Sequence, residues 1–162
     1  MNVRTRTEEE IAQIYCRQID TVYRVCFLFL KRRADAEDAA QATFLKLISR
    51  APALQNERHE KAWLIVTAAN VCKNVLASAW RKRVVLTEEA AFPPAPERAG
   101  GLLASVLALP DRYKTAIYMH YYEGYSAAEI ARAMGKSENS VYGYLHKGRK
   151  LLKAELLEEE RG

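Results

Sequence analysis

The sequence predicts an all-α fold made of two small helical domains that are joined by a proline-rich linker. No glycine occurs before Gly100 in this chain of 162 residues, whereas alanine and straight-chain residues, which favour helix, are frequent. Apolar residues recur at helical spacing, and the alternating β-branched runs that indicate strands are absent. The segment Phe92–Pro96 contains three prolines and cannot continue a helix, so it predicts a stiff linker.

The proline-rich segment also predicts the domain boundaries. We expect an N-terminal helical domain at 1–83, a linker at 84–100 and a C-terminal domain at 101–162 that ends in a short acidic tail. The net charge of +5 divides into +6 for residues 1–83, −2 for the linker, +4 for residues 101–154 and −3 for the tail. Two basic blocks suggest nucleic acid or an anionic surface as a partner, and the alternative is a pair of solvated basic faces.

Composition narrows the classes of protein further. Hydrophobic residues make up 49% and charged residues 28%, which is typical of a folded globular chain. Residues 1–10 are polar, so we expect no secretory signal. The longest apolar run in the first half, Val25–Leu30, is far shorter than the roughly 20 residues of a membrane span. Cys16, Cys26 and Cys72 form neither a disulfide framework nor a metal pair, which favours a reduced, cytoplasmic setting.

Two helices are expected at the start of the N-terminal domain. The first has an apolar stripe that includes two cysteines, and Cys16 and Cys26 are both interpreted as core or near-core thiols. The members of this stripe are Ile11, Ile14, Tyr15, Ile19, Val22, Val25, Cys26 and Phe29. The second helix should begin at Asp35 as its N-cap and end before Pro52. Its inward residues are Ala36, Ala40, Phe44 and Leu47.

A polar segment at 55–59 precedes a long third helix, expected from Glu60 to Arg83. Its buried side is predicted to contain Trp63, Val66, Thr67, Val71, Val75 and Leu76. A second, polar stripe consists of Asn70, Lys73, Asn74, Ala77 and Arg81. Amides at helical spacing can hydrogen-bond to base edges, and the flanking basic residues can bind phosphates. A solvated helix face is the alternative interpretation of this stripe.

The C-terminal domain contains the pattern of a helix-turn-helix. Pro110 opens a helix that runs through Tyr121, and a turn over 123–125 follows. Ser126 and Glu129 form a capping box ahead of a short helix at 127–134. Gly135 then supplies a left-handed position, and Ser137 is the N-cap of a second helix that runs towards residue 157. This order of elements predicts a helix-turn-helix, with a generic helical hairpin as the alternative.

The second helix of this pair has two distinct faces. Val141, Leu145, Gly148 and Leu152 share one face and should point inward. The opposite face is basic, polar and aromatic, as expected of a helix that reads the major groove. It consists of Asn139, Tyr142, Gly143, His146, Lys147 and Lys150.

Four segments, taken in order, resemble the bacterial RNA polymerase sigma factors. They are Asp35–Leu45 (DAEDAAQATFL), Ala62–Asn70 (AWLIVTAAN), Leu109–Tyr113 (LPDRY) and Gly124–Ala131 (GYSAAEIA). The presence of only two helical domains with a short linker resembles the extracytoplasmic-function (ECF) group. The resemblance covers about residues 8–158 and implies a protein that binds core polymerase, reads the −10 and −35 promoter elements, and stabilises the opened promoter.

The resemblance also implies roles for individual residues. The residues implied to bind core polymerase are Asp35, Glu37, Asp38, Gln41 and Leu45. Phe44 is expected to pack in the hydrophobic core of the domain. Contacts with the −10 element, including a flipped base, fall to Asn56, Arg58, Asn70, Lys73, Asn74, Ala77, Arg81 and Arg83. Contacts with the −35 element fall to Ser137, Asn139, Tyr142, Gly143, Tyr144, His146, Lys147 and Arg149.

Tyr142 and Tyr144 depart from the family pattern, because many members carry Lys or Arg there, so the −35 preference is expected to be unusual. The resemblance implies no cofactor and no enzymatic activity, since the polymerase does the chemistry, and it makes an anti-sigma partner plausible. A stand-alone helix-turn-helix regulator is the alternative function. A hydrolase or metal enzyme is disfavoured, because His59, His120 and His146 are scattered and no phosphate loop or zinc spacing is present.

Overall fold

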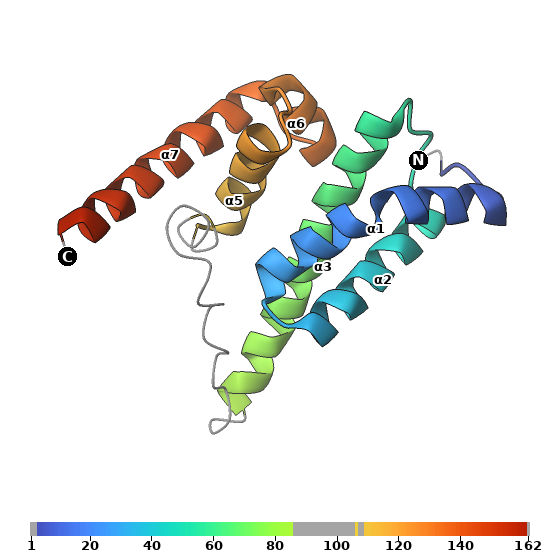
Figure 1. The fold of residues 1–162 in the computed structure, drawn as a ribbon, viewed down its shortest axis with the longest axis horizontal. Coiled ribbons are helices and arrows are strands. Elements are labelled where there is room, and N and C mark those ends of the chain that lie inside the picture. Colours follow the sequence, from blue (N-terminus) through green and yellow to red (C-terminus); the bar gives the residue numbers. More distant parts are fainter. Residues whose placement is uncertain (1–2, 86–105, 107–108, 162) are drawn as a thin grey trace. The chain divides into compact units, whose positions relative to one another are not determined.

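The computed structural model describes the backbone of residues 3–85, 106 and 109–161, and side chains in these ranges except at 80–85 and 155–161. The chain divides into two compact units, 1–93 and 94–162. All regular structure in the described residues is helical, which confirms the all-α class (Figure 1). The elements are α1 (Glu8–Leu30), α2 (Arg33–Arg50), α3 (Glu57–Val85), α5 (Asp111–Ile117), the π-helical turn η1 (Tyr118–Tyr122), α6 (Ala127–Met134) and α7 (Glu138–Arg161).

The first unit is a three-helix bundle in which α1, α2 and α3 each contact the other two. Its centre is fully buried and apolar, formed by Val22, Cys26, Leu47, Leu64 and Cys72. The four inward residues predicted for α2 are all buried, as expected from their helical spacing. Phe44 packs in this core, where its ring lies 4.9 Å from that of Tyr15.

The start of α2 differs from the prediction. Lys31 adopts a left-handed conformation (φ 62°) and its N–H donates to the carbonyl of Phe27 at 2.8 Å, which ends α1. The chain therefore turns at once, and α2 begins at Arg33 with Arg32 as an N-cap that makes no side-chain hydrogen bond. Asp35 lies inside the first turn instead of at the cap, a position where its negative charge still favours the helix.

The prediction for the buried side of α3 was wrong in part. Leu64, Ile65 and Cys72 are buried, Trp63 is only half-buried, and Val75 is 39% exposed. The buried arc includes the small residues Ala62, Ala68 and Ala69, because α3 packs against two helices at once. Residues 73–79 are all exposed, so Val75 and Leu76 lie beyond the end of the core.

Cys16 is another correction, because it is exposed while Cys26 and Cys72 are buried. Cys26 follows Cys16 by ten positions, or about 2.8 helical turns, so the two side chains do not share a face. The thiol of Cys26 lies beside the thiol of Cys72 and the hydroxyl of Thr43. Hydrogen bonds from Cys72 and, to a lesser degree, Thr43 outweigh burial and lower the pKa of Cys26.

Among the described helices, α3 has a stretch, Glu57–Ala79, that is long and apolar enough to cross a membrane by length and composition. Several of its apolar residues, such as Leu64 and Ile65, are buried between α1 and α2. We therefore interpret α3 as the core helix of the bundle.

The second unit confirms the predicted caps. The N–H of Glu129 donates to Oγ of Ser126 at 3.2 Å, and the N–H of Ser126 donates to Oε1 of Glu129 at 3.1 Å. Gly135 is left-handed (φ 67°), and Oγ of Ser137 accepts from the N–H of Ser140 at the start of α7. The helix that begins after Pro110 differs from the prediction in one respect, because it widens into the π-helical turn η1 before Glu123.

Candidate nucleic-acid and polymerase interfaces

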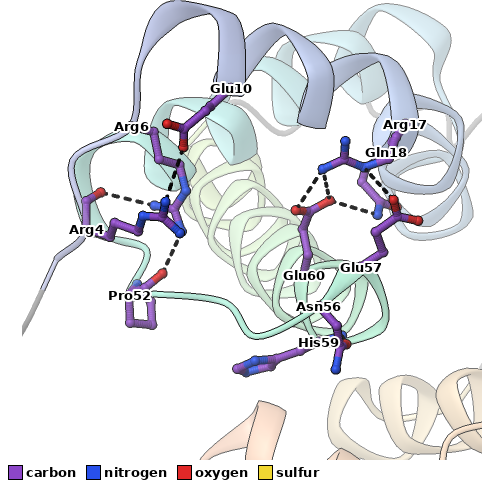
Figure 2. Close-up of polar contacts among 10 residues, drawn as sticks. All are labelled: Arg4, Arg6, Glu10, Arg17, Gln18, Pro52, Asn56, Glu57, His59 and Glu60. Atoms are coloured by element: carbon purple, nitrogen blue, oxygen red, sulfur yellow. Dashed lines mark hydrogen bonds and ion pairs between the residues drawn. The ribbon is translucent and has the colours of Figure 1, made fainter.

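The loop at 51–56 connects α2 to α3 and is held by an N-terminal arm, residues 3–7. Figure 2 shows the arm beside the loop. The N–H of Arg4 donates to the carbonyl of Ala51 at 3.0 Å. The guanidinium of Arg6 donates to the carbonyls of Ala51 (3.2 Å) and Pro52 (2.6 Å). Sequence reasoning missed Arg6, because its partners lie 45 and 46 residues away and no local pattern marks them.

The other end of the loop is held by the first turn of α3. Oδ1 of Asn56 accepts from the N–H of His59 at 2.8 Å, and Nδ1 of His59 accepts from the N–H of Gln55 at 3.2 Å. The carboxylate of Glu60 is buried and accepts from both Arg17 and Gln18 at 3.1 Å (Figure 2). The predicted −10 contact Asn56 thus caps α3 with its side-chain oxygen.

The predicted polar stripe of α3 lies on the outside of the first unit. Asn70, Lys73, Asn74 and Ala77 are all exposed. Because they are spaced by three or four residues, they share one helix face. Arg81 and Arg83 lie on the last turns of α3, and their side chains fall outside the described residues. Arg58, at the start of α3, is exposed.

The five residues predicted to bind core polymerase are all exposed along α2. Glu37 pairs with Arg33 at 3.4 Å on this surface, an exposed pair of little energetic weight. Leu45 is 65% exposed, and Ile48, three residues further on, is 45% exposed. Ile48 was not predicted, although its spacing from Gln41 and Leu45 places it on the same face. Two exposed aliphatic side chains beside acidic residues form a surface suited to a protein partner.

The residues predicted to contact the −35 element lie mostly on the exposed face of α7, on which Tyr142 is 58% exposed. Asn139, His146 and Lys147 are also exposed there. Nothing lies within 4 Å of the position that a Cβ at Gly143 would occupy. This face therefore combines a ring, an amide and positive charge with an open backbone position.

Three other residues predicted for the −35 side have structural contacts. Tyr144 is half-buried, with its ring 5.9 Å from that of Tyr113 on α5, so it packs between helices. Ser137 caps α7. Nη1 of Arg149 donates to the hydroxyl of Tyr121 at 2.8 Å. Tyr121 and Tyr122 are 56% and 66% exposed, a pair of rings that helix periodicity did not predict because η1 changes the phase of the helix.

No group of three or more potential metal-binding side chains occurs among the described residues. The groups exposed on the surfaces described above include amides, charged side chains and aromatic rings. Such groups bind and orient a polymer, and they suit recognition of nucleic acid and protein.

Comparison with known proteins identifies the two units. The sigma-70 region 2 model matches residues 15–82, and the sigma-70 region 4 model matches residues 100–152. The RNA polymerase sigma factor SigV of Bacillus subtilis is 27% identical over 142 residues, covering 85% of this chain and 86% of SigV. The ECF RNA polymerase sigma factor SigL of Mycobacterium tuberculosis is 28% identical over 155 residues, covering 90% and 88%.

A solved structure has the same fold. It is the sigma factor RpoE of Bartonella quintana in complex with the anti-sigma factor NepR. The TM-score is 0.63 at 20% identity, and the match covers 93% of this chain and 98% of that one.

Two regions of one family, in the family's order, define the class of protein as a transcription initiation factor. The chain belongs to the sigma-70 family of RNA polymerase sigma factors, in the ECF group. Sigma-70 regions 2 and 4 bind core polymerase and promoter DNA, so the protein directs promoter-specific transcription. This result decides between the two functions left open by the sequence, in favour of the sigma factor.

Proposed function

We propose that the two units divide promoter recognition between them. The domain at 1–83 binds core polymerase and reads the −10 element, the segment at 84–100 is the linker, and the domain at 101–162 reads the −35 element. The observation that carries this proposal is that α3 and α7 both present exposed polar and basic residues at helical spacing. These are Asn70, Lys73 and Asn74 on α3, and Asn139, His146 and Lys147 on α7. An exposed basic and polar face is what phosphate and base contacts require.

In the first unit, the −10 contacts are assigned to the exposed stripe of α3 and the loop that precedes it. Asn70 and Asn74 supply amides for unstacked bases, and Lys73 supplies positive charge. Arg58 and Asn56 lie at the loop, where Asn56 acts mainly through its cap. The proposed −10 contacts extend along α3 to Ala77, Arg81 and Arg83.

In the second unit, the −35 contacts are assigned to Asn139, Tyr142, Gly143, His146 and Lys147. Ser137 and Tyr144 act indirectly, since one caps α7 and the other packs on Tyr113. Arg149 binds phosphate next to the hydroxyl of Tyr121. Tyr142 brings a ring in place of a charge, so this position favours contact with thymine methyl groups over contact with phosphate.

The polymerase-binding surface on α2, defined by Asp35, Glu37, Asp38, Gln41 and Leu45, is also proposed as the surface that an anti-sigma factor covers. The exposed Leu45 supports this proposal, because an aliphatic side chain at 65% exposure gains from burial by any protein partner. The relative RpoE is held by the anti-sigma factor NepR. We further propose that the protein works in the cytoplasm, as an initiation factor and not as an enzyme.

The test is transcription by core polymerase reconstituted with the purified protein. Start sites mapped across a genomic library define both promoter elements, after which Lys73, Asn74, Tyr142 and Lys147 are changed singly to Ala. A base contact should lose about 1–3 kcal/mol in a sequence-dependent way, and a phosphate contact should lose affinity uniformly. Arg24→Ala, at an exposed basic residue on α1 outside both proposed contact faces, is the control. No association with core polymerase, or no base dependence, would overturn the proposal.

A further inference from the structure

The N-terminal arm makes closely spaced contacts with the loop at 51–56. The guanidinium of Arg6 donates to three backbone carbonyls. One is that of Arg4 in its own arm, at 3.1 Å, and the other two are those of Ala51 (3.2 Å) and Pro52 (2.6 Å) in the loop. The N–H of Arg4 adds a further bond to Ala51. These carbonyls lie outside any helix, so the arm supplies partners that secondary structure does not.

The electrostatic setting of Arg6 strengthens this link. Its guanidinium is partly buried, and burial together with the neighbouring charge of Arg4 lowers its pKa, while Glu10 and Glu60 oppose that change. An arginine remains charged in this setting, because its pKa in water is far above neutral. Its bonds to carbonyl oxygens are therefore charge-assisted and stronger than neutral ones. A lysine could not reproduce them, because it lacks the planar fork.

The loop is thus anchored at both ends while its middle stays open. Arg6 holds residues 51 and 52. The Asn56 cap and the pairing of the buried Glu60 with Arg17 hold the first turn of α3. Between these anchors, Ala53 and Gln55 are exposed and Leu54 is half-buried. Figure 2 shows the two clusters of contacts on either side of the loop.

We propose that Arg6 is a positioning residue for the −10 contact, so that the N-terminal arm determines how strictly the loop discriminates among bases. This inference rests on the proposed role of the loop in reading the −10 element. To discriminate among bases, polar groups must be placed so that they hydrogen-bond to one base and not to the others. A loop that is free to shift can hydrogen-bond to several bases and therefore discriminates less. Arg6 acts through the loop and touches no base itself.

The experiment measures a specificity ratio with reconstituted holoenzyme. Initiation is compared on the preferred promoter and on promoters with one substituted base, either in the −10 or in the −35 element. Arg6→Ala and Arg6→Lys should both lower the −10 ratio about tenfold, the loss of one well-placed base contact. The −35 ratio should stay unchanged. Arg24→Ala, an exposed arginine on α1, is the matched control and should leave both ratios as they are.

A ratio is independent of the fraction of active protein, so a merely destabilised variant lowers both rates and leaves it unchanged. An unchanged −10 ratio in both Arg6 variants, or an equal fall in both ratios, overturns the inference. A double variant, Gln55→Ala with Arg58→Ala, tests the loop itself. If it alters the −10 ratio and the Arg6 variants do not, only the inference about the arm fails. If the double variant leaves the −10 ratio unchanged, the proposed role of the loop fails, and with it the inference about the arm.

Discussion

Gly148 lies directly against Ile117, and a methyl group built on its α-carbon would approach Cγ1 of Ile117 to 2.8 Å. This is the point where α7 packs against the end of α5, and both residues are buried. The missing side chain lets α7 approach closely enough to present its opposite face outward. The packing of Gly148 therefore determines how the proposed −35 surface is supported.

The first prediction compares the two glycines inside α7. Gly148→Ala and Gly143→Ala gain the same helix propensity, roughly 1 kcal/mol. Only the methyl group at 148 meets a packed neighbour, and overpacking costs about 1–3 kcal/mol. The Gly148 variant should therefore be less stable than the Gly143 variant by about that amount. Hydrogen exchange of the α7 amides measures both, and equal protection in the two variants would contradict the packing.

The second prediction concerns two leucines on α2. Leu47 is fully buried, so Leu47→Ala should lower the free energy of unfolding of the first unit by about 2–5 kcal/mol. Leu45 is 65% exposed, so Leu45→Ala should change it by less than about 0.5 kcal/mol. Leu45→Ala should instead weaken core polymerase binding, by about tenfold if Leu45 lies at the centre of the contact.

Tryptophan fluorescence is the readout for stability, because both tryptophans, Trp63 and Trp80, lie in the first unit. Binding is measured by titration with labelled core polymerase. Unimpaired binding by the Leu45 variant would remove Leu45 from the proposed surface.

The third prediction concerns the ion pair between the buried Glu60 and Arg17 in the first unit. Glu60→Gln removes the negative charge that accepts from Arg17 and Gln18. Because hydrogen bonds to charged groups contribute about 1.5–3 kcal/mol, this variant should lower the free energy of unfolding of the first unit by about that amount. Glu57 pairs with the same arginine at 3.6 Å but is 75% exposed, so Glu57→Gln should cost at most about 1 kcal/mol. Urea unfolding followed by tryptophan fluorescence ranks the two, and a larger effect at Glu57 would contradict the structure.

The fourth prediction concerns thiol reactivity. Cys16 is exposed, whereas Cys26 and Cys72 are buried, so a small thiol reagent should modify one cysteine rapidly in the native protein. The other two should react only as the first unit unfolds. Cys16→Ser should abolish the fast phase. A second fast equivalent would mean that the core opens more readily than its packing indicates.

The fifth prediction concerns the capping box of α6. Ser126→Ala removes the acceptor for the N–H of Glu129 and should cost about 0.5–2 kcal/mol. Ser126→Gly, which keeps the backbone free to adopt the cap conformation, should cost only a few tenths. Hydrogen exchange of α6 amides reports the difference. Equal stabilities for the two variants would show that the cap contributes little.

Several elements could be predicted from the sequence because the interactions that specify them are local. The Ser126–Glu129 capping box and the left-handed Gly135 are determined by residues within a few positions of one another. The inward stripe of α2 follows from helix periodicity alone. The polar stripe of α3 and the exposed face of α7 were also found in this way, so most of the candidate site was visible before the fold was known.

The tertiary structure decided what depends on neighbours that are distant in the chain. The buried face of α3 is set by contact with two helices, so periodicity alone placed Val75 in a core that ends before it. Tyr144 was assigned to DNA, yet it packs on Tyr113 of α5. Arg6 meets its loop partners across 45 and 46 residues. Local sequence specifies which residues form a helix and its caps. Burial and long-range hydrogen bonds arise only when segments that are distant in the chain pack against one another.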